Sequence, residues 1–448
     1  LLAWGIFCAA SYGLGSYLVR RIAPATQVSF GAIAPFIKLF SGIGLNSFIA
    51  WGAMHFPVNY PAVYWLFYVL ELGLFVATGD LSKIKLPRGM EKGQWVVFFH
   101  ALLFLPFAVV PSYNFDDLSA HLFIPQQTVL FGQFDFSPAQ ASGLNPSMLP
   151  MGANTSVFML GGENAMRLLN ISMYSFGYVL LESFVRQRWG SRVAFLSVLF
   201  GVVTPFTHWT LGICFVDSFF FALSTLLFVL SLQFVVLRDP SLLPWLGLLS
   251  GLGYLAKQQI IFMLVPLAIP IGIVVLQQLL LFPGRALSLI GVSGLVFCST
   301  VAIPLVHNYI LSGNPLFPLY NSVFKSPYWP AQDLVDSRWN QPFSFATLWT
   351  ITFFGSRFVE NSDFSFGFAP LVLLPAIVVL GAHRALKKDP WILAMLLLSI
   401  AYSYVCFSTT GLYIRYLVGL IAPLSLCLAL TTQQLLFQKR EAAGLSVV

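Results

Sequence analysis

Apolar runs of about twenty residues recur from one end of this chain to the other. A run of that length, wound as a helix, crosses a bilayer core of about 30 Å, and the alternating short strands of a membrane barrel are not seen in the sequence. We therefore predict an all-α polytopic membrane protein with about thirteen transmembrane helices. The expected ranges are 1–18, 29–54, 60–78, 95–111, 163–185, 193–211, 217–237, 242–256, 258–281, 286–305, 368–383, 390–408 and 414–436.

Two long polar segments, at about 111–162 and 306–367, interrupt the apolar pattern. In the first, Asp117 to Thr128 is expected to form a short helix on the membrane surface, with Asp116 as its N-cap. Asp117 and His121 would then share a face of that helix. The second segment opens with the strong turn signal Ser312-Gly313-Asn314-Pro315 and is rich in aromatic residues. Catalytic groups, if present, must come from these two segments and from helix ends.

Charged residues make up 9% of the 448 residues, against about 25% in a soluble domain. The net charge of +7 follows from topology, because sixteen of the 23 Lys and Arg residues lie in alternate short loops. This is the positive-inside pattern, and it predicts that those loops are cytoplasmic and that the two long segments face outward. A nucleic-acid footprint is therefore excluded. The sixteen are Arg20, Arg21, Lys83, Lys85, Arg88, Lys92, Arg186, Arg188, Arg192, Arg238, Arg285, Arg384, Lys387, Lys388, Lys439 and Arg440.

The five cysteines form no Cys-x-x-Cys pair, which favours neither a disulfide framework nor a zinc site. The chain begins at Leu1 inside an apolar run, so we expect further residues before it.

Asp116 and Asp117 are adjacent carboxylates on the predicted outer face of a chain that carries few charges. A carboxylate at an external cavity can take a proton from an attacking hydroxyl group; a solvated helix cap explains the pair equally simply. His121 is a candidate ligand for a phosphate or a divalent metal ion, or an interfacial histidine bonded to the backbone. Three well-spaced metal ligands are not visible, so a metal requirement stays open.

Lys257 and Arg415 are cations on the predicted acidic face, at helix ends. Either side chain suits the phosphate of an anionic lipid, and the fork of arginine suits it better. The alternative is that each snorkels to the membrane interface. Asp217 opens a predicted span, where it lines the cavity or caps the helix.

Five sequence stretches occur in an order that resembles the GT-C superfamily of integral-membrane glycosyltransferases, such as protein O-mannosyltransferases and the aminoarabinose transferases of lipid A. They are Phe115-Asp116-Asp117-Leu118-Ser119-Ala120-His121-Leu122, Phe215-Val216-Asp217, Gly253-Tyr254-Leu255-Ala256-Lys257, Gly313-Asn314-Pro315-Leu316-Phe317-Pro318 and Ile414-Arg415-Tyr416-Leu417. The resemblance covers most of the chain from about residue 95, which predicts N-terminal membrane helices over 1–94 and a catalytic core over 95–448.

The resemblance implies transfer of a sugar from a polyprenyl-phosphate donor to a lipid, glycan or protein acceptor on the non-cytoplasmic face. It also implies that an acidic residue of the first large loop, here Asp116 with Asp117 beside it, acts as the base. Arg415 and Lys257, with His121 and Asp217, would then bind the donor phosphate and substrate. Inversion, a bacterial inner membrane and a periplasmic active site are further expectations. The chain lacks the Trp-Trp-Asp motif of oligosaccharyltransferases, which disfavours transfer of a whole oligosaccharide.

Two other functions compete with this interpretation. A multi-pass transporter or flippase of a lipid-linked substrate would favour broken helices near the midplane and repeated halves. An O-antigen polymerase or ligase also has a large external loop, but relies on arginines there, whereas the loops of this chain are net acidic.

Overall fold

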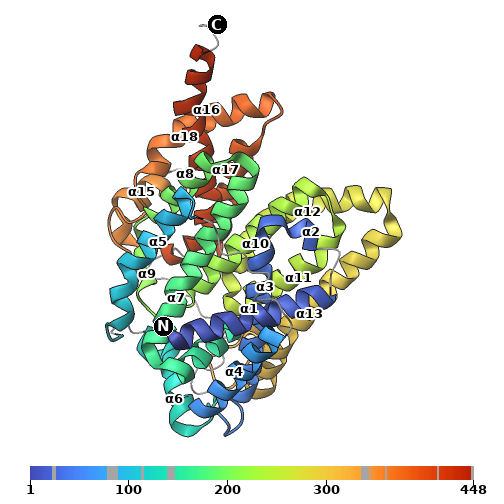
Figure 1. Ribbon diagram of the computed structural model, residues 1–448, viewed down its shortest axis with the longest axis vertical. Coiled ribbons are helices and arrows are strands. Elements are labelled where there is room, and N and C mark those ends of the chain that lie inside the picture. Colours follow the sequence, from blue (N-terminus) through green and yellow to red (C-terminus); the bar gives the residue numbers. More distant parts are fainter. Residues whose placement is uncertain are drawn as a thin grey trace.

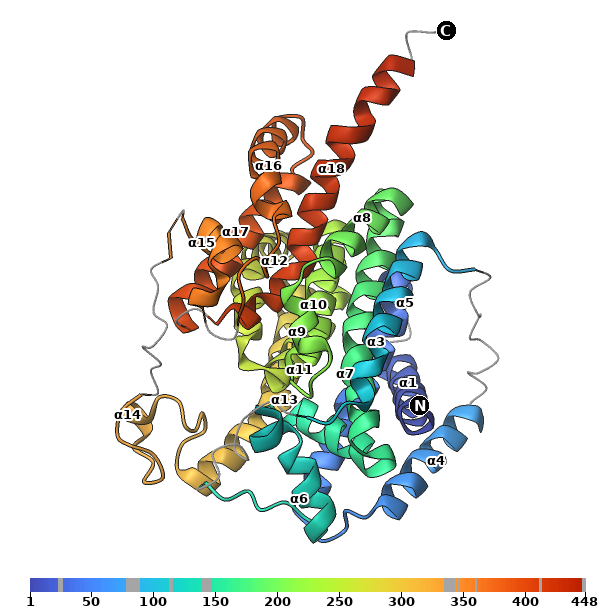
Figure 2. The same cartoon turned by 90° about the vertical axis from the view of Figure 1, so that its left-hand side faces the viewer.

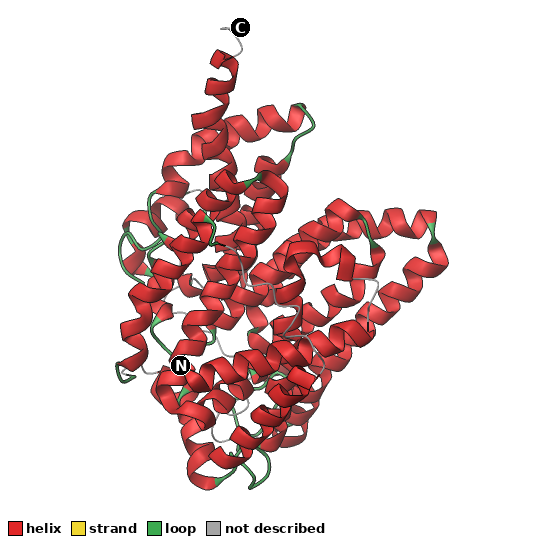
Figure 3. Cartoon of the chain, in the orientation of Figure 1, coloured by secondary structure: helices red, strands yellow, loops and turns green. Residues whose placement is uncertain are grey.

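The computed structural model describes residues 1–22, 27–77, 89–112, 116–138, 147–333, 343–344, 346–358, 361–410 and 413–444. Within these ranges the chain is helical, and loops join the helices (Figure 3). Lys83, Lys85 and Arg88 of one predicted cytoplasmic loop lie outside the described residues, and so does Phe115 of the first motif. The side chains of Lys439 and Arg440 are not described either.

The fold class is confirmed, because every predicted span overlaps a helix. The long elements are α1 (Leu2–Ile22), α3 (Ala34–Ala53), α4 (Pro61–Ala77), α5 (Lys92–Phe104), α7 (Met148–Trp189), α8 (Ser191–Val202), α10 (Asp217–Leu237), α11 (Leu243–Ala256), α12 (Ile261–Leu281), α13 (Pro283–Ser312), α16 (Ala369–Leu386), α17 (Trp391–Thr410) and α18 (Ile421–Gly444). Short helices are α2 (Gln27–Phe30), α6 (Phe123–Phe131), α9 (Phe206–Leu211), α14 (Asn321–Phe324) and α15 (Thr347–Phe353). Of the described segments, ten are long and apolar enough to cross a membrane, while α4 and α8 are apolar but shorter.

Helix α7 begins earlier than the sequence pattern predicts. The span expected at 163–185 continues back to Met148, so the end of the first polar segment is helical. The two parts of α7 meet at Gly161 and Gly162, where the backbone leaves the helical conformation and Gly162 has φ of 70°. Glycine adopts this left-handed conformation without a steric penalty, and a glycine pair is a common cause of a helix kink.

Helices α7 and α10 and the last span, Ile414–Leu436, are the most buried of the ten candidate membrane spans, the last span at 83%. Burial inside the protein covers 72% of the most apolar window of α7 and 78% of that of α10, but only 11% of that of α13. Helices α1, α3, α5, α8 and α10 all pack against α7, which runs through the middle of the molecule (Figures 1 and 2). The apolar surface of α13 therefore faces outward, where a bilayer would cover it.

Contacts between loops agree with the predicted topology. Arg186 forms an ion pair of 3.3 Å with Glu91, and the Gln278 amide donates a hydrogen bond to the carbonyl of Arg238. Arg186, Glu91 and Arg238 come from loops predicted to be cytoplasmic, and Gln278 lies near the predicted cytoplasmic end of α12. On the opposite side, the backbone N–H of Asn59 donates to the carbonyl of Gly132. Figure 2 shows α6 and α14 at the end of the molecule opposite α16 and the C-terminus.

Helices α1 and α3 approach each other closely through small residues. A Cβ atom added at Gly42 would lie 1.7 Å from the carbonyl oxygen of Ser11, whereas one added at Gly52 of the same helix meets nothing within 4 Å. Small residues permit such contact between membrane helices, where dispersion forces replace the hydrophobic effect.

We predict that Gly42→Ala destabilises the protein by about 1–3 kcal/mol, because the added methyl group must push the two backbones apart. Gly52→Ala is the matched control, and it should leave the melting temperature unchanged or raise it slightly, since alanine is the better helix former. Thermal unfolding of both variants in the same detergent measures the difference. Equal melting temperatures would contradict the close packing of α1 on α3.

Candidate active site

The two adjacent aspartates point to different partners. Residues Asp117–His121 form a single π-helical turn, closed by a hydrogen bond of 2.7 Å from the Leu122 N–H to the Asp117 carbonyl, and α6 follows. Such turns are frequent at functional sites. The expectation that Asp116 caps this helix is wrong, because its side chain makes no capping hydrogen bond. Its carboxylate instead pairs with Arg415.

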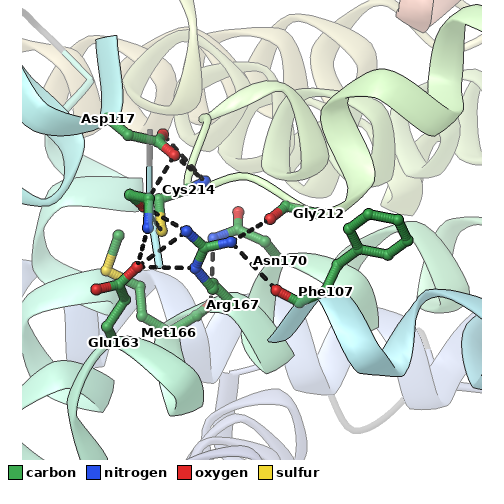
Figure 4. A network of polar contacts seen from close by, with 9 residues as sticks. Phe107, Asp117, Glu163, Met166, Arg167, Asn170, Gly212 and Cys214 are labelled. Atoms are coloured by element: carbon green, nitrogen blue, oxygen red, sulfur yellow. Dashed lines mark hydrogen bonds and ion pairs between the residues drawn. The ribbon is translucent and has the colours of Figure 1, made fainter. Parts of the chain in front are cut away.

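Asp117 is fully buried and holds the first loop against the turn before α10. Its carboxylate accepts hydrogen bonds from the backbone N–H of Cys214 at 3.0 and 3.1 Å and from the Ser112 hydroxyl at 3.2 Å. Figure 4 shows this carboxylate turned toward Cys214. Burial raises the pKa of Asp117 from 3.8 to about 6, although the hydrogen bonds and the charge of Arg167 lower it.

Arg167 connects the same loop to α7 and α9. The guanidinium group donates to the carbonyl oxygens of Phe107 (3.2 Å) and Gly212 (2.6 Å) and to the Ser112 hydroxyl (2.5 Å). The guanidinium group also forms an ion pair of 2.9 Å with Glu163, four residues earlier on α7. A buried arginine with all these partners fixes the position of the π-helical turn (Figure 4).

Asp116 and Arg415 join the first loop to the start of the last span. The Arg415 Nη1 atom lies 2.9 Å from the Asp116 Oδ2 atom, and the two side chains are 15% and 32% exposed. The guanidinium carbon of Arg415 lies 5.2 Å from the centroid of the Phe215 ring and 5.6 Å from that of Tyr416. The pair is thus held on aromatic rings but remains reachable from outside.

Asp217 and Lys257 form a second pair beside the first. The Lys257 ammonium lies 2.6 Å from the Asp217 carboxylate and 4.4 Å from the centroid of the Tyr416 ring. The side chains are 9% and 1% exposed, respectively, so Lys257 does not snorkel to the interface. Tyr416 therefore contacts both cations, and the two ion pairs form one cluster of four charged side chains around it.

His121 lies at the edge of this cluster, with its ring centroid 5.6 Å from that of Phe215. Burial lowers the pKa of His121 to about 4, while the charge of Asp116 opposes that change. The imidazole is therefore neutral near pH 7, so it can form hydrogen bonds but carries no positive charge. Among the described residues, no group of three His, Cys, Asp or Glu side chains is placed to hold a metal ion.

The turn predicted at Ser312-Gly313-Asn314-Pro315 is confirmed, but the helix before it is longer than the span expected at 286–305, so the second polar segment begins after residue 306. Helix α13 ends at Ser312, and Gly313 follows in the left-handed conformation with φ of 74°. The Asn321 side chain organises the loop that follows, since it donates to the carbonyl oxygens of Trp329 and Pro330. Asp336, Arg338 and Glu360 of this segment lie outside the described residues.

Residues 151–303 match the family model of dolichyl-phosphate-mannose-protein mannosyltransferases. The match confirms the resemblance to the GT-C superfamily. It supports a membrane glycosyltransferase of the GT-C type, and so favours an enzyme over the transporter and polymerase alternatives. The matched range contains Asp217 and Lys257, while Asp116 and Arg415 lie outside it. No curated protein and no solved structure matches the chain.

The sequence did not indicate the roles of Tyr416, Phe215 and Arg167. Both aromatic residues stand in the quoted motifs beside Arg415 and Asp217, but nothing in an aromatic-rich chain distinguishes a ring under a cation from one in a membrane belt. For Arg167, the signal was the Glu163 partner four residues earlier. Its three contacts outside α7 depend on the tertiary fold.

We predict that Asp117 makes folding stability depend on pH. Because its folded pKa of about 6 lies above the 3.8 of the free side chain, the folded protein holds the proton more tightly. Stability from this group is present below about pH 4 and is lost as pH rises through 6. Asp117→Asn should therefore flatten the fall in melting temperature between pH 4 and 7. Asp135→Asn, at an exposed position after α6, should keep the wild-type slope; equal slopes in all three proteins would contradict the prediction.

Proposed function

We propose that this protein transfers a sugar from a polyprenyl-phosphate donor to a hydroxyl group of a lipid, glycan or protein acceptor. The observation that carries the proposal is the pairing of Asp116 with Arg415 beside Lys257 and Asp217. A carboxylate for the acceptor and cations for a phosphate are the groups that this reaction requires, and they meet at the ends of helices. The proposed location is a bacterial inner membrane with the site facing the periplasm.

Asp116 is the proposed base. Its carboxylate takes the proton of the acceptor hydroxyl as the oxygen attacks the anomeric carbon of the donor sugar. The bond from that carbon to the phosphate oxygen breaks, and the polyprenyl phosphate leaves with the electron pair. One displacement inverts the anomeric configuration. The reaction needs one base and no protonated acid for the leaving group, because a phosphate is already a good leaving group.

Asp117 has a positioning role in this proposal. With its carboxylate bonded to the N–H of Cys214 and the Ser112 hydroxyl, the side chain holds the π-helical turn in place. In the proposal it positions Asp116 and does not touch the acceptor. This division of roles follows from the difference in exposure between the two neighbours, 32% for Asp116 and none for Asp117.

Arg415 is the proposed ligand of the donor phosphate. Its guanidinium is partly exposed and binds phosphate in a two-pronged fashion that suits a diester. Lys257 stays within its buried pair with Asp217 and adds positive charge nearby. When the phosphate binds Arg415, the ion pair with Asp116 exchanges for a pair with the donor. The carboxylate is then released for the acceptor, so the donor must bind first.

We predict that Asp116→Asn lowers kcat by about 10²–10⁴, the usual contribution of a general base. Donor affinity should not fall, because Arg415 no longer has to break its ion pair with the Asp116 carboxylate before it binds the donor phosphate. The test uses the full chain in nanodiscs, with polyprenyl-phosphate mannose as the probe and an envelope lipid and protein extract as acceptor. Asp116→Glu is the matched control and should retain part of the activity.

Arg415→Gln should affect donor binding, whereas Asp116→Asn affects kcat. Loss of the guanidinium weakens donor binding and raises KM for the donor, while Asp116 stays intact. A folded Asp116→Asn protein with wild-type kcat would contradict the role of Asp116 as base, and an unchanged donor KM in Arg415→Gln would contradict the role of Arg415.

A further inference from the structure

A small pocket lies beside the charged cluster, between the π-helical turn, α6 and the first part of α7. Its walls include His121, Ser147, Asn154 and Val216. Its volume is about 20 Å³, which accommodates one water molecule or one hydroxyl group but not a sugar ring. The pocket is therefore a slot for a single polar group.

Asn154 contributes to this pocket an amide whose oxygen has no hydrogen-bond partner among the described residues. The residue is 2% exposed, and its Oδ1 atom receives no hydrogen bond from any residue of the described ranges. A buried amide without a partner costs about 1–3 kcal/mol. Because an amide both donates and accepts, a hydroxyl group in the pocket would satisfy it in either orientation of the amide.

The pocket is joined to the proposed base by a short chain of contacts. His121, which lines the pocket, lies against the Phe215 ring. Phe215 supports Arg415, and Arg415 is paired with Asp116. Val216, also in the pocket wall, directly precedes Asp217. The pocket therefore lies close to the Asp116–Arg415 pair, with His121 and Phe215 between them.

We infer that the pocket is a specificity slot that receives one hydroxyl group of a sugar, with Asn154 as its hydrogen-bond partner and His121 in its wall. The inference rests on the proposed function and adds the feature by which the substrate is selected. A site built to hydrogen-bond a hydroxyl group rejects an analogue without it, since the buried polar group is left unpaired. The hydroxyl belongs to the donor sugar or to the acceptor sugar, and the same chemistry serves both.

Asn154→Leu tests the slot, with the full chain in nanodiscs and polyprenyl-phosphate mannose and its single-deoxy analogues as donors. Replacing an unpartnered buried amide with an apolar group of similar size should keep or raise the melting temperature. It should also lower kcat/KM by about tenfold or more, because the hydrogen bond to the hydroxyl is lost. Thr155→Val is the matched control: its Oγ1 is also buried without a partner, but Thr155 does not line the pocket.

The donor series identifies the source of the hydroxyl. If wild type rejects one deoxy donor and Asn154→Leu accepts it as well as the parent, the hydroxyl is that of the donor. If wild type treats all donors alike and Asn154→Leu still loses kcat at unchanged donor affinity, the hydroxyl is that of the acceptor. Wild-type kcat/KM in Asn154→Leu, with activity lost in Asp116→Asn, would overturn the slot alone. Equal product from wild type, Asp116→Asn and Asn154→Leu would reject the proposed function itself.

Discussion

Charge pairing in a medium of low polarity is the constraint on which this site depends. A charged side chain at the edge of a membrane domain is costly unless it meets an opposite charge. Asp116 and Arg415 are 299 positions apart, and Asp217 and Lys257 are 40 apart, yet each pair is in direct contact. The two pairs bring the first loop, the start of α10, the end of α11 and the last span to one place. Tyr416 lies under both cations and joins the pairs into a single cluster.

The cluster is close to electrically neutral, and this suits the proposed exchange. Two carboxylates balance two cations, so the site carries little excess charge before a donor arrives. A donor phosphate that takes Arg415 restores a pair at that position and leaves Asp116 with an uncompensated charge, which makes it a better base. Asp117 keeps its place during this exchange because its partners are backbone and hydroxyl groups that the donor does not touch.

The helices were largely predictable, because an apolar run long enough to span a bilayer can form few structures other than a membrane helix. The start of α7 was not, since Gly152, Asn154 and Thr155 give this part a polar appearance. Those residues are buried by neighbouring helices, a tertiary effect that local hydropathy does not report. The division at residue 94 stays a prediction.

The sequence was enough to name most residues of the candidate site, but not to show how they lie relative to one another. Scarcity of charge singled out Asp116, Asp217, Lys257 and Arg415, which the structure brings together. Which carboxylate meets which cation depends on long-range packing, so the capping role given to Asp116 was wrong. Asn154 is an uncharged residue in a helical segment, and only its burial without a partner distinguishes it.

Mass spectrometry of envelope glycolipids and glycans, from cells that express wild type or Asp116→Asn at equal levels, would show whether the protein transfers a sugar with Asp116 as the base. A species heavier by one sugar should be present with the wild type and absent with the variant. The same glycans in both cells, with both proteins folded in the membrane and the donor shown to be present, would contradict this prediction.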